Sequence, residues 1–289
     1  MKLRGDVLKQ IRRKRGLSQT ALADGICTQA TISLMEKQNR LPKMDILTAI
    51  CKRLSIQPER IIENEGNQVN EQFNAIVREL VAHHFEQAEQ LLSHLSVKQL
   101  TSDFDKQRYY YLLGMVQVHN HQLDDAIFNF ELVLTQFATT SANIYLATTT
   151  AGMALAYYKR NDHQRAKRLT DRAVRLIDNK KLIGSLHQWA SIYCQLANLY
   201  HQLGDDRQAV EMASRGVELC RQHDSLFILD ELYYARGIAE EGLGQNQGAK
   251  QSLQIAWSIS LARKESAVSQ QIQAALQSCS RLLNLNTKK

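Results

Sequence analysis

Proline is almost absent from this 289-residue sequence, and its absence restricts the fold. Pro42 and Pro58 are the only two prolines, so the chain after residue 58 contains none. Proline interrupts helices, whereas the Ala, Leu, Lys, Glu and Gln that are abundant here favour them. The sequence therefore predicts an all-α protein.

Several other features are also missing. No apolar run reaches the roughly 18 residues that a membrane span needs, and the chain begins with too many charges for a secretion signal. The five cysteines are scattered without paired spacing, which is typical of reduced thiols in a cytoplasmic protein. We find no glycine-rich phosphate loop, no nucleophile elbow and no His or Cys pattern suited to a metal. These absences predict a protein that is not an enzyme and has no metal, no cofactor and no membrane partner.

Positive charge is concentrated at the start of the chain. Residues 1–64 contain thirteen Lys and Arg and six Asp and Glu, whereas the remaining residues carry 23 of each sign. Arg12 and Arg13 begin a continuous basic run that ends at Arg15. Such a concentration is expected for a partner that is a polyanion, although a charged, solvated helix would give the same count.

The apolar spacing of this basic region predicts four helices and a short fifth helix after Pro58. The first ends at Gly16, the second is capped by Ser18 and the third by Thr28, while the fourth begins near Pro42. The third helix is unusual because it begins with small polar residues, and these point outward when its apolar residues face the core: Gln29, Ala30, Thr31 and Ser33. Side chains of this kind fit the major groove of DNA, where Gln pairs with adenine and methyl groups touch thymine.

The same residues carry a resemblance to a known family. Ser18-Gln19, Leu22-Ala23, Thr28-Gln29, Ile32-Ser33 and Glu36 resemble the helix-turn-helix of phage-repressor-type (XRE family) regulators. The resemblance implies that Gln19 braces a phosphate and that the start of the third helix reads bases. Cys27 stands where most members have glycine, so the left-handed turn is expected at Gly25. The complete set of expected DNA-binding residues is Arg12, Arg15, Gln19, Thr28, Gln29, Ala30, Thr31, Ser33, Lys37 and Arg40.

Beyond residue 70 the chain repeats itself. The segments 113–134, 153–174, 196–217 and 236–257 align without gaps, and a degenerate first copy precedes them. Each copy reads as a helix, a short polar turn and a second helix, with a small alanine where the two helices cross. The aligned alanines are Ala88, Ala126, Ala166, Ala209 and Ala249.

This pattern resembles the tetratricopeptide repeat. Gly204 and Gly244 match its turn glycine, and Tyr157 and Tyr200 match the aromatic residue of its first helix. The resemblance implies a right-handed solenoid of about five helix pairs, closed by a capping helix over residues 266–285. We expect a DNA-binding domain over residues 1–63, a linker over 64–70, and a sensing and dimerisation domain over 71–289.

A phage-type helix-turn-helix followed by long tetratricopeptide repeats is similar to the PlcR/Rgg/PrgX group of regulators from Gram-positive bacteria. The resemblance implies a cytoplasmic homodimer that binds a palindromic operator in double-stranded DNA. It also implies quorum sensing, in which a short re-imported peptide binds the repeats and changes the affinity for DNA. The alternative left open is a scaffold whose repeats bind a protein partner.

In such solenoids one face of each first helix lines the groove that holds the ligand. We therefore expect the peptide to contact residues at successive turns of these helices: Arg108, Tyr111, Met115, Tyr158, Lys159, Cys194, Asn198, His201, Glu231 and Tyr234. Within this set Lys159 or Arg108 is expected to hold a carboxylate of the peptide, and Glu231 or Glu241 to hold its amine. Asn198 is expected to bond the peptide backbone.

Overall fold

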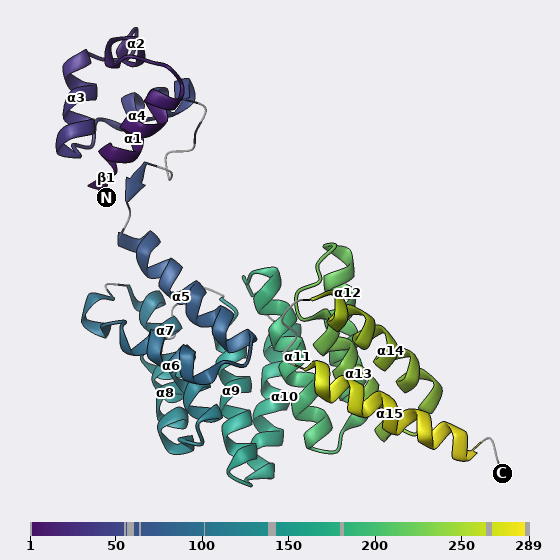
Figure 1. Cartoon of the computed structure of the whole chain (residues 1–289). Helices are drawn as coiled ribbons and strands as arrows, with labels where there is room; N and C mark the ends of the chain where they lie inside the picture. Colours follow the sequence, from purple (N-terminus) through teal and green to yellow (C-terminus); the bar gives the residue numbers. More distant parts are fainter. Residues whose placement is uncertain are drawn as a thin grey trace. The chain divides into compact units, whose positions relative to one another are not determined.

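The computed structural model describes residues 2–54, 56, 61–63, 65–100, 102–137, 143–179, 182–263 and 268–286. Most of these residues are helical, which confirms the predicted fold class, and the chain divides into two compact units, Met1–Asn74 and Ala75–Lys289 (Figure 1). No helix in the described ranges is both long and apolar enough to cross a membrane.

The first unit is built from the first four predicted helices. They are α1 (Gly5–Lys14), α2 (Gln19–Ala23), α3 (Gln29–Gln38) and α4 (Met44–Leu54). Their apolar residues meet in one core, and each of the following is at most 1% exposed: Leu8, Leu22, Ile32, Met35, Leu47, Ile50 and Leu54. This core fixes the orientation of α3 and leaves the opposite side of its first turns toward solvent.

A small antiparallel sheet closes this unit and was not predicted. The short fifth helix expected after Pro58 falls partly on residues 57–60, which lie outside the described ranges, and Ile62–Glu63 form a strand instead. Strand β1 (Lys2–Leu3) pairs with β2 (Ile62–Glu63), with Leu3 opposite Ile62. The amide of Arg4 also donates to the carbonyl of Ile61 at 2.7 Å. Leu3 and Ile61 are 1% and 0% exposed and belong to the core of the four helices. The pairing thus ties the two ends of the unit together.

Helix α5 (Glu65–Val81) runs through most of the segment that was expected to be a linker. The boundary between the two compact units falls within this helix, between Asn74 and Ala75. Phe73 and Ile76 are both fully buried at helical spacing, which accounts for the continuous helix. The expected polar break at residues 64–70 is therefore helical from Glu65 onward.

Five helix pairs and a final helix form the repeats, as predicted, and the first pair begins with α5. The pairs are α5 with α6 (Phe85–Ser93), α7 (Asp103–His119) with α8 (Leu123–Thr135), α9 (Tyr145–Lys159) with α10 (His163–Asn179), α11 (Leu186–Gln202) with α12 (Asp206–Gln222), and α13 (Leu229–Gly242) with α14 (Asn246–Ala262). The predicted capping helix is α15 (Ser269–Asn286), which packs on α14.

The register of the repeats follows the aligned alanines. All five, from Ala88 to Ala249, are 0% exposed and lie in the second helix of a pair. Five residues before each alanine, the turn between the helices contains a residue with positive φ: His83, His121, Asn161, Gly204 and Gly244. Only the last two are glycines, so the backbone conformation of the turn is more regular than its sequence.

The repeats stack with their first helices on the inner side. Neighbouring first helices pack on one another, α7 on α9, α9 on α11 and α11 on α13. The second helices of neighbouring repeats pack far less closely in the described part of the chain. A stack whose first helices are closer together than its second helices curves toward the first helices. We call the curved side formed by α7, α9, α11 and α13 the inner face.

Candidate nucleic-acid interface and ligand-binding face

The turn between α2 and α3 has the geometry that the sequence predicts. Ser18 caps α2, and its Oγ accepts a hydrogen bond from the Ala21 amide at 3.0 Å. Thr28 caps α3 in the same way, with its Oγ1 accepting from the Thr31 amide at 3.3 Å. Gly25 lies between them with φ of +68°, the left-handed conformation expected at this residue in place of Cys27. Two capped helices and a glycine turn thus fix the start of α3.

The first turn of α3 presents the side chains that were expected to read bases. Thr28, Gln29 and Ala30 are exposed, while Thr31 and Ser33 are half-buried. Two hydrogen bonds join Gln29, Gln19 and Glu36 in a relay. Gln29 Nε2 donates to Gln19 Oε1 at 2.6 Å, and Gln19 Nε2 donates to Glu36 Oε2 at 2.8 Å. Both glutamines are therefore oriented before any DNA arrives, which lowers the entropy lost on binding.

Arg12 does not belong to the exposed basic surface, which corrects the prediction that it contacts DNA. Its side chain is buried, with Nε donating to Glu36 Oε1 at 2.5 Å and Nη2 donating to Glu36 Oε2 at 3.0 Å. Nη1 also donates to the Leu17 carbonyl at 2.7 Å. Burial raises the pKa of Glu36, but the hydrogen bonds from Arg12 and Gln19 outweigh it and hold that pKa below its ordinary value. Arg12 thus joins α1 to α3.

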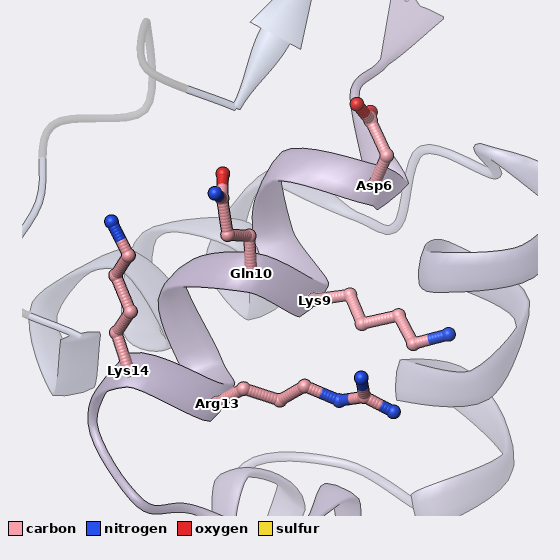
Figure 2. A pocket seen from close by; sticks show the side chains of 5 residues that line it. All are labelled: Asp6, Lys9, Gln10, Arg13 and Lys14. Carbon is pink, nitrogen blue, oxygen red and sulfur yellow. The ribbon is translucent and has the colours of Figure 1, made fainter.

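The other predicted basic residues, Arg15, Lys37 and Arg40, are exposed. The structure adds two more cations on α1. A shallow hollow is lined by Asp6, Lys9, Gln10, Arg13 and Lys14, and Lys9 and Arg13 extend side by side from one face of the helix (Figure 2). Lys9 is also close enough to Glu36 to favour the ionised carboxylate. Lys9 and Arg13 were not among the expected DNA-binding residues, because the concentration of charge in the sequence does not show which cations share a helix face.

On the inner face of the second unit, α7 and α9 bring together several of the predicted ligand-binding residues. Tyr111 makes an edge contact with Tyr145, with ring centroids 5.4 Å apart, and packs in the same apolar cluster as Met115. Burial raises the pKa of Tyr111, so its hydroxyl stays protonated. Lys159 Nζ donates to the Val118 carbonyl at 3.1 Å, and burial lowers the pKa of this amine.

A second group of predicted residues lies on α11 and α13. Cys194 is 5% exposed, and Asn198 Nδ2 lies 3.8 Å from its Sγ. Glu231 follows in the first turn of α13 and is close enough to raise the pKa of the Cys194 thiol, which burial raises most. The amide of Asn198 is half-buried, and among the described residues its Nδ2 makes only this weak contact to sulfur. This group combines an amide, a thiol and a carboxylate on one surface.

Comparison with known proteins supports both halves of this arrangement. A helix-turn-helix family model matches residues 8–61, and a tetratricopeptide repeat model matches residues 190–223. Among solved structures, the chain is similar to Bacillus thuringiensis PlcR in complex with the peptide PapR7 and DNA, with a TM-score of 0.66 and 16% identity over 96% of this chain and 99% of that one. It is also similar to ComR from S. thermophilus in complex with DNA and its signalling peptide, with a TM-score of 0.58 and 12% identity over 96% and 99% of the two chains. No curated protein matches the sequence.

The chain has the fold of PlcR and ComR. This likeness extends over both compact units and therefore covers the helix-turn-helix and the repeats in one match. At this level of identity it concerns the fold alone. The roles of the residues on the two candidate surfaces therefore follow from the geometry of those surfaces.

Within this PlcR-type fold, three of the predicted ligand-binding residues are already engaged inside the solenoid. His201 Nδ1 lies 2.6 Å from Asp206 Oδ1, and the ring of Tyr158 lies 5.1 Å from that of His163. Tyr234 packs against residues of α15. These contacts hold the three side chains in place. In the described part of the chain, Asn198 Nδ2 has only its weak contact to sulfur, and Glu231 Oε1 has no hydrogen-bond partner. The prediction for the whole set stays a prediction.

Two residues at the turn between α5 and α6, His83 and Phe85, were not among the predicted ligand-binding residues. The ring of Phe85 stacks on that of His119, with the ring centroids 3.8 Å apart. His83 Nε2 lies 3.9 Å from Glu231 Oε2, and Val81 packs on the cluster that contains Cys194. This turn therefore reaches both α7 and α13. The only sequence signal for it was an aromatic residue directly after His83-His84.

Proposed function

We propose that this protein is a DNA-binding transcription regulator whose repeats bind a short signalling peptide and thereby alter its affinity for DNA. In this proposal Gln29, Ala30, Thr31 and Ser33 read base edges in the major groove. The exposed cations and Gln19 contact phosphates. The inner face of α7, α9, α11 and α13 holds the peptide.

The observation that carries the proposal is the relay from Glu36 through Gln19 to Gln29. It orients an exposed glutamine at the start of a helix whose other side is buried, which is the arrangement that base recognition requires. The peptide part is supported by the half-buried Asn198 amide and Glu231 carboxylate on the inner face, because an extended peptide needs hydrogen-bonding partners for its backbone as well as apolar contacts. It is also supported by PlcR and ComR, whose similar structures contain DNA and a peptide.

We further propose that the protein acts in the cytoplasm as a homodimer on a palindromic operator. A single recognition helix contacts only a few base pairs, so two copies related by symmetry are needed for selectivity. The peptide would be secreted and then imported, as in quorum sensing. The DNA binding of the regulator would then depend on the density of the cells that secrete the peptide.

Nuclease footprinting with the purified full-length protein tests this function. The labelled DNA is the region upstream of its own gene. Footprints are compared without addition, with the peptide fraction of spent culture medium, and with the proteins of a cell extract. We expect a protected site with two-fold symmetry whose occupancy changes when that fraction is added. If no site is protected under any condition, DNA recognition is wrong. If only a protein from the cell extract changes the occupancy, the repeats bind a protein partner and the peptide role is wrong.

A further inference from the structure

Glu231 is the least satisfied charged group on the inner face. Its side chain is only 14% exposed, and its Oε1 is buried without a hydrogen-bond partner in the described part of the chain. A carboxylate in such a position is unfavourable, because burial removes its water without supplying donors in return. Burial accordingly raises the pKa of Glu231 to about 7, with a further contribution from Asp230.

The neighbouring groups do not neutralise this carboxylate. Arg263 forms an ion pair with Asp230, which is fully buried next to Glu231 on α13. His83 lies 3.9 Å from Glu231 Oε2, but burial and the proximity of His84 lower its pKa, so that its imidazole is mainly uncharged at neutral pH. The Cys194 thiol is also neutral, because burial raises its pKa. Glu231 thus faces a neutral imidazole and a neutral thiol. The Arg263 guanidinium, which forms its ion pair with Asp230, lowers the pKa of Glu231 by less than burial raises it.

The position of His83 is suited to a cationic group of a ligand that binds from solvent. His83 is part of the turn between α5 and α6, its side chain is 42% exposed, and its Nε2 lies 3.9 Å from Glu231 Oε2. An ammonium or guanidinium in that place would pair with a carboxylate in surroundings that include the apolar side chain of Val81. Charge pairs in such surroundings are stronger than in water.

We propose that Glu231 binds a cationic group of the peptide ligand, an ammonium or a guanidinium, and that this group replaces the His83 imidazole. The proposal rests on the proposed function, because it assumes that a peptide binds the inner face. It also separates two residues that the sequence left equivalent. Glu241 lies on the same face of α13 and is half-buried, but it has no buried oxygen without a partner.

Selection from libraries of short random peptides tests this assignment. The full-length protein is mixed with three libraries: peptides with a free amino terminus, peptides acetylated at the amino terminus, and acetylated peptides without Lys and Arg. Bound peptides are isolated with the protein by gel filtration and sequenced by mass spectrometry. The best one is then titrated against the wild type, Glu231→Gln, Glu241→Gln and His83→Ala.

We expect the first two libraries to yield peptides with a cation and the third to yield far fewer. Glu231→Gln should weaken the best peptide at least roughly tenfold, as expected for the loss of a charged hydrogen bond. Glu241→Gln should leave its affinity unchanged, and His83→Ala should bind it at least as tightly as the wild type. Equal yields from the third library, or an affinity of Glu231→Gln within about twofold of the wild type, would overturn the proposal and leave the peptide function standing. If no library yields a bound peptide, the peptide function itself fails.

Discussion

Among single residues, Gln29 is the one whose role in DNA binding can be tested most directly. Its amide is oriented by Gln19, which is held in turn by Glu36. Because a bidentate pair with a base contributes about 1–3 kcal/mol of discrimination, Gln29→Ala should lower the affinity for the specific site by that amount. Affinity for unrelated DNA should hardly change, since it depends on phosphate contacts.

Gln38 offers a matched control for this test. It is an exposed glutamine at the other end of α3, and Gln38→Ala should leave both affinities unchanged. Fluorescence titration of operator and random-sequence duplexes measures both affinities. Equal operator binding by Gln29→Ala and the wild type would mean that the start of α3 does not read bases.

The raised pKa of Glu231 predicts that this residue destabilises the folded repeats increasingly as the pH rises. Its pKa rises from 4.5 in the unfolded chain to about 7 in the folded protein, so the folded state holds the proton more tightly between these values. The groups that face it are Asp230, Arg263, Cys194 and His83. A carboxyl group whose pKa is raised by folding disfavours the folded state increasingly as the pH rises from 4.5 through 7.

Glu231→Gln should therefore stabilise the repeats by roughly 3 kcal/mol at pH 8, since each pKa unit corresponds to about 1.4 kcal/mol. The gain should disappear near the ordinary pKa of glutamate. Urea unfolding followed by tryptophan fluorescence reports on the repeats alone, because Trp189 and Trp257 both lie there. Glu241→Gln is the control. If Glu231→Gln increases the free energy of unfolding equally at pH 8 and at pH 4.5, this account is wrong.

At the scale of helices, the ion pair between Arg12 and Glu36 links α1 to α3. Both side chains are at most 9% exposed, and removal of one partner leaves the other charge buried. Breaking a buried pair in this way typically costs about 3–5 kcal/mol. Arg12→Ala should therefore unfold or strongly destabilise the first unit, instead of weakening DNA binding alone.

The neighbouring Arg13 provides the comparison, because it is exposed on the same helix. Arg13→Ala should keep the thermal stability of the wild type, weaken binding to all DNA sequences and reduce the slope of affinity against salt. Circular dichroism melting of both variants, followed by DNA titration at several salt concentrations, separates the two effects. If Arg12→Ala melts like Arg13→Ala, the buried pair does not stabilise the unit.

At the turns between paired helices, two substitutions are expected to change the stability in opposite directions. Gly204 and His121 occupy equivalent positions with φ of +78° and +60°. A Cβ added at Gly204 would meet no atom within 4 Å, so Gly204→Ala should cost about 1 kcal/mol through its backbone conformation alone. His121→Gly should be neutral or stabilising for the same reason. Urea unfolding of the two variants measures both values, and a loss for both would show that side-chain contacts dominate these turns.

The same elements show which parts of the structure were predictable from the sequence. Helix caps at Ser18 and Thr28 and the repeat register depend on local spacing, and the structure confirms them. The burial of Arg12 was also encoded locally, because Arg12 follows Leu8 by one helical turn, but a run of four cations conceals this phase. The pairing of β1 with β2 joins segments about sixty residues apart and has no local signal. The contact of His83 with Glu231 depends on the curvature of the whole stack.

In the whole molecule, the net charge and the two compact units divide the chain in nearly the same way. The excess of Lys and Arg lies within residues 1–64, whereas the repeats are electrically balanced. Electrostatic attraction to DNA is therefore concentrated in one unit. A balanced second unit avoids nonspecific binding to nucleic acid and leaves its surface available for other contacts.

This division predicts how the protein assembles. A single helix-turn-helix contacts too few base pairs for selectivity, so we expect a homodimer that places two α3 helices one turn of DNA apart, about 34 Å. The repeats are the larger unit and present the longer surface, so the dimer should be held mainly through residues beyond 64. Light scattering should then give twice the monomer mass for the full-length protein and for residues 65–289. The fragment 1–64 should be monomeric and should bind the operator poorly. A monomeric full-length protein at micromolar concentration, with or without operator DNA, would contradict this assembly, and selectivity would then have to come from contacts outside α3.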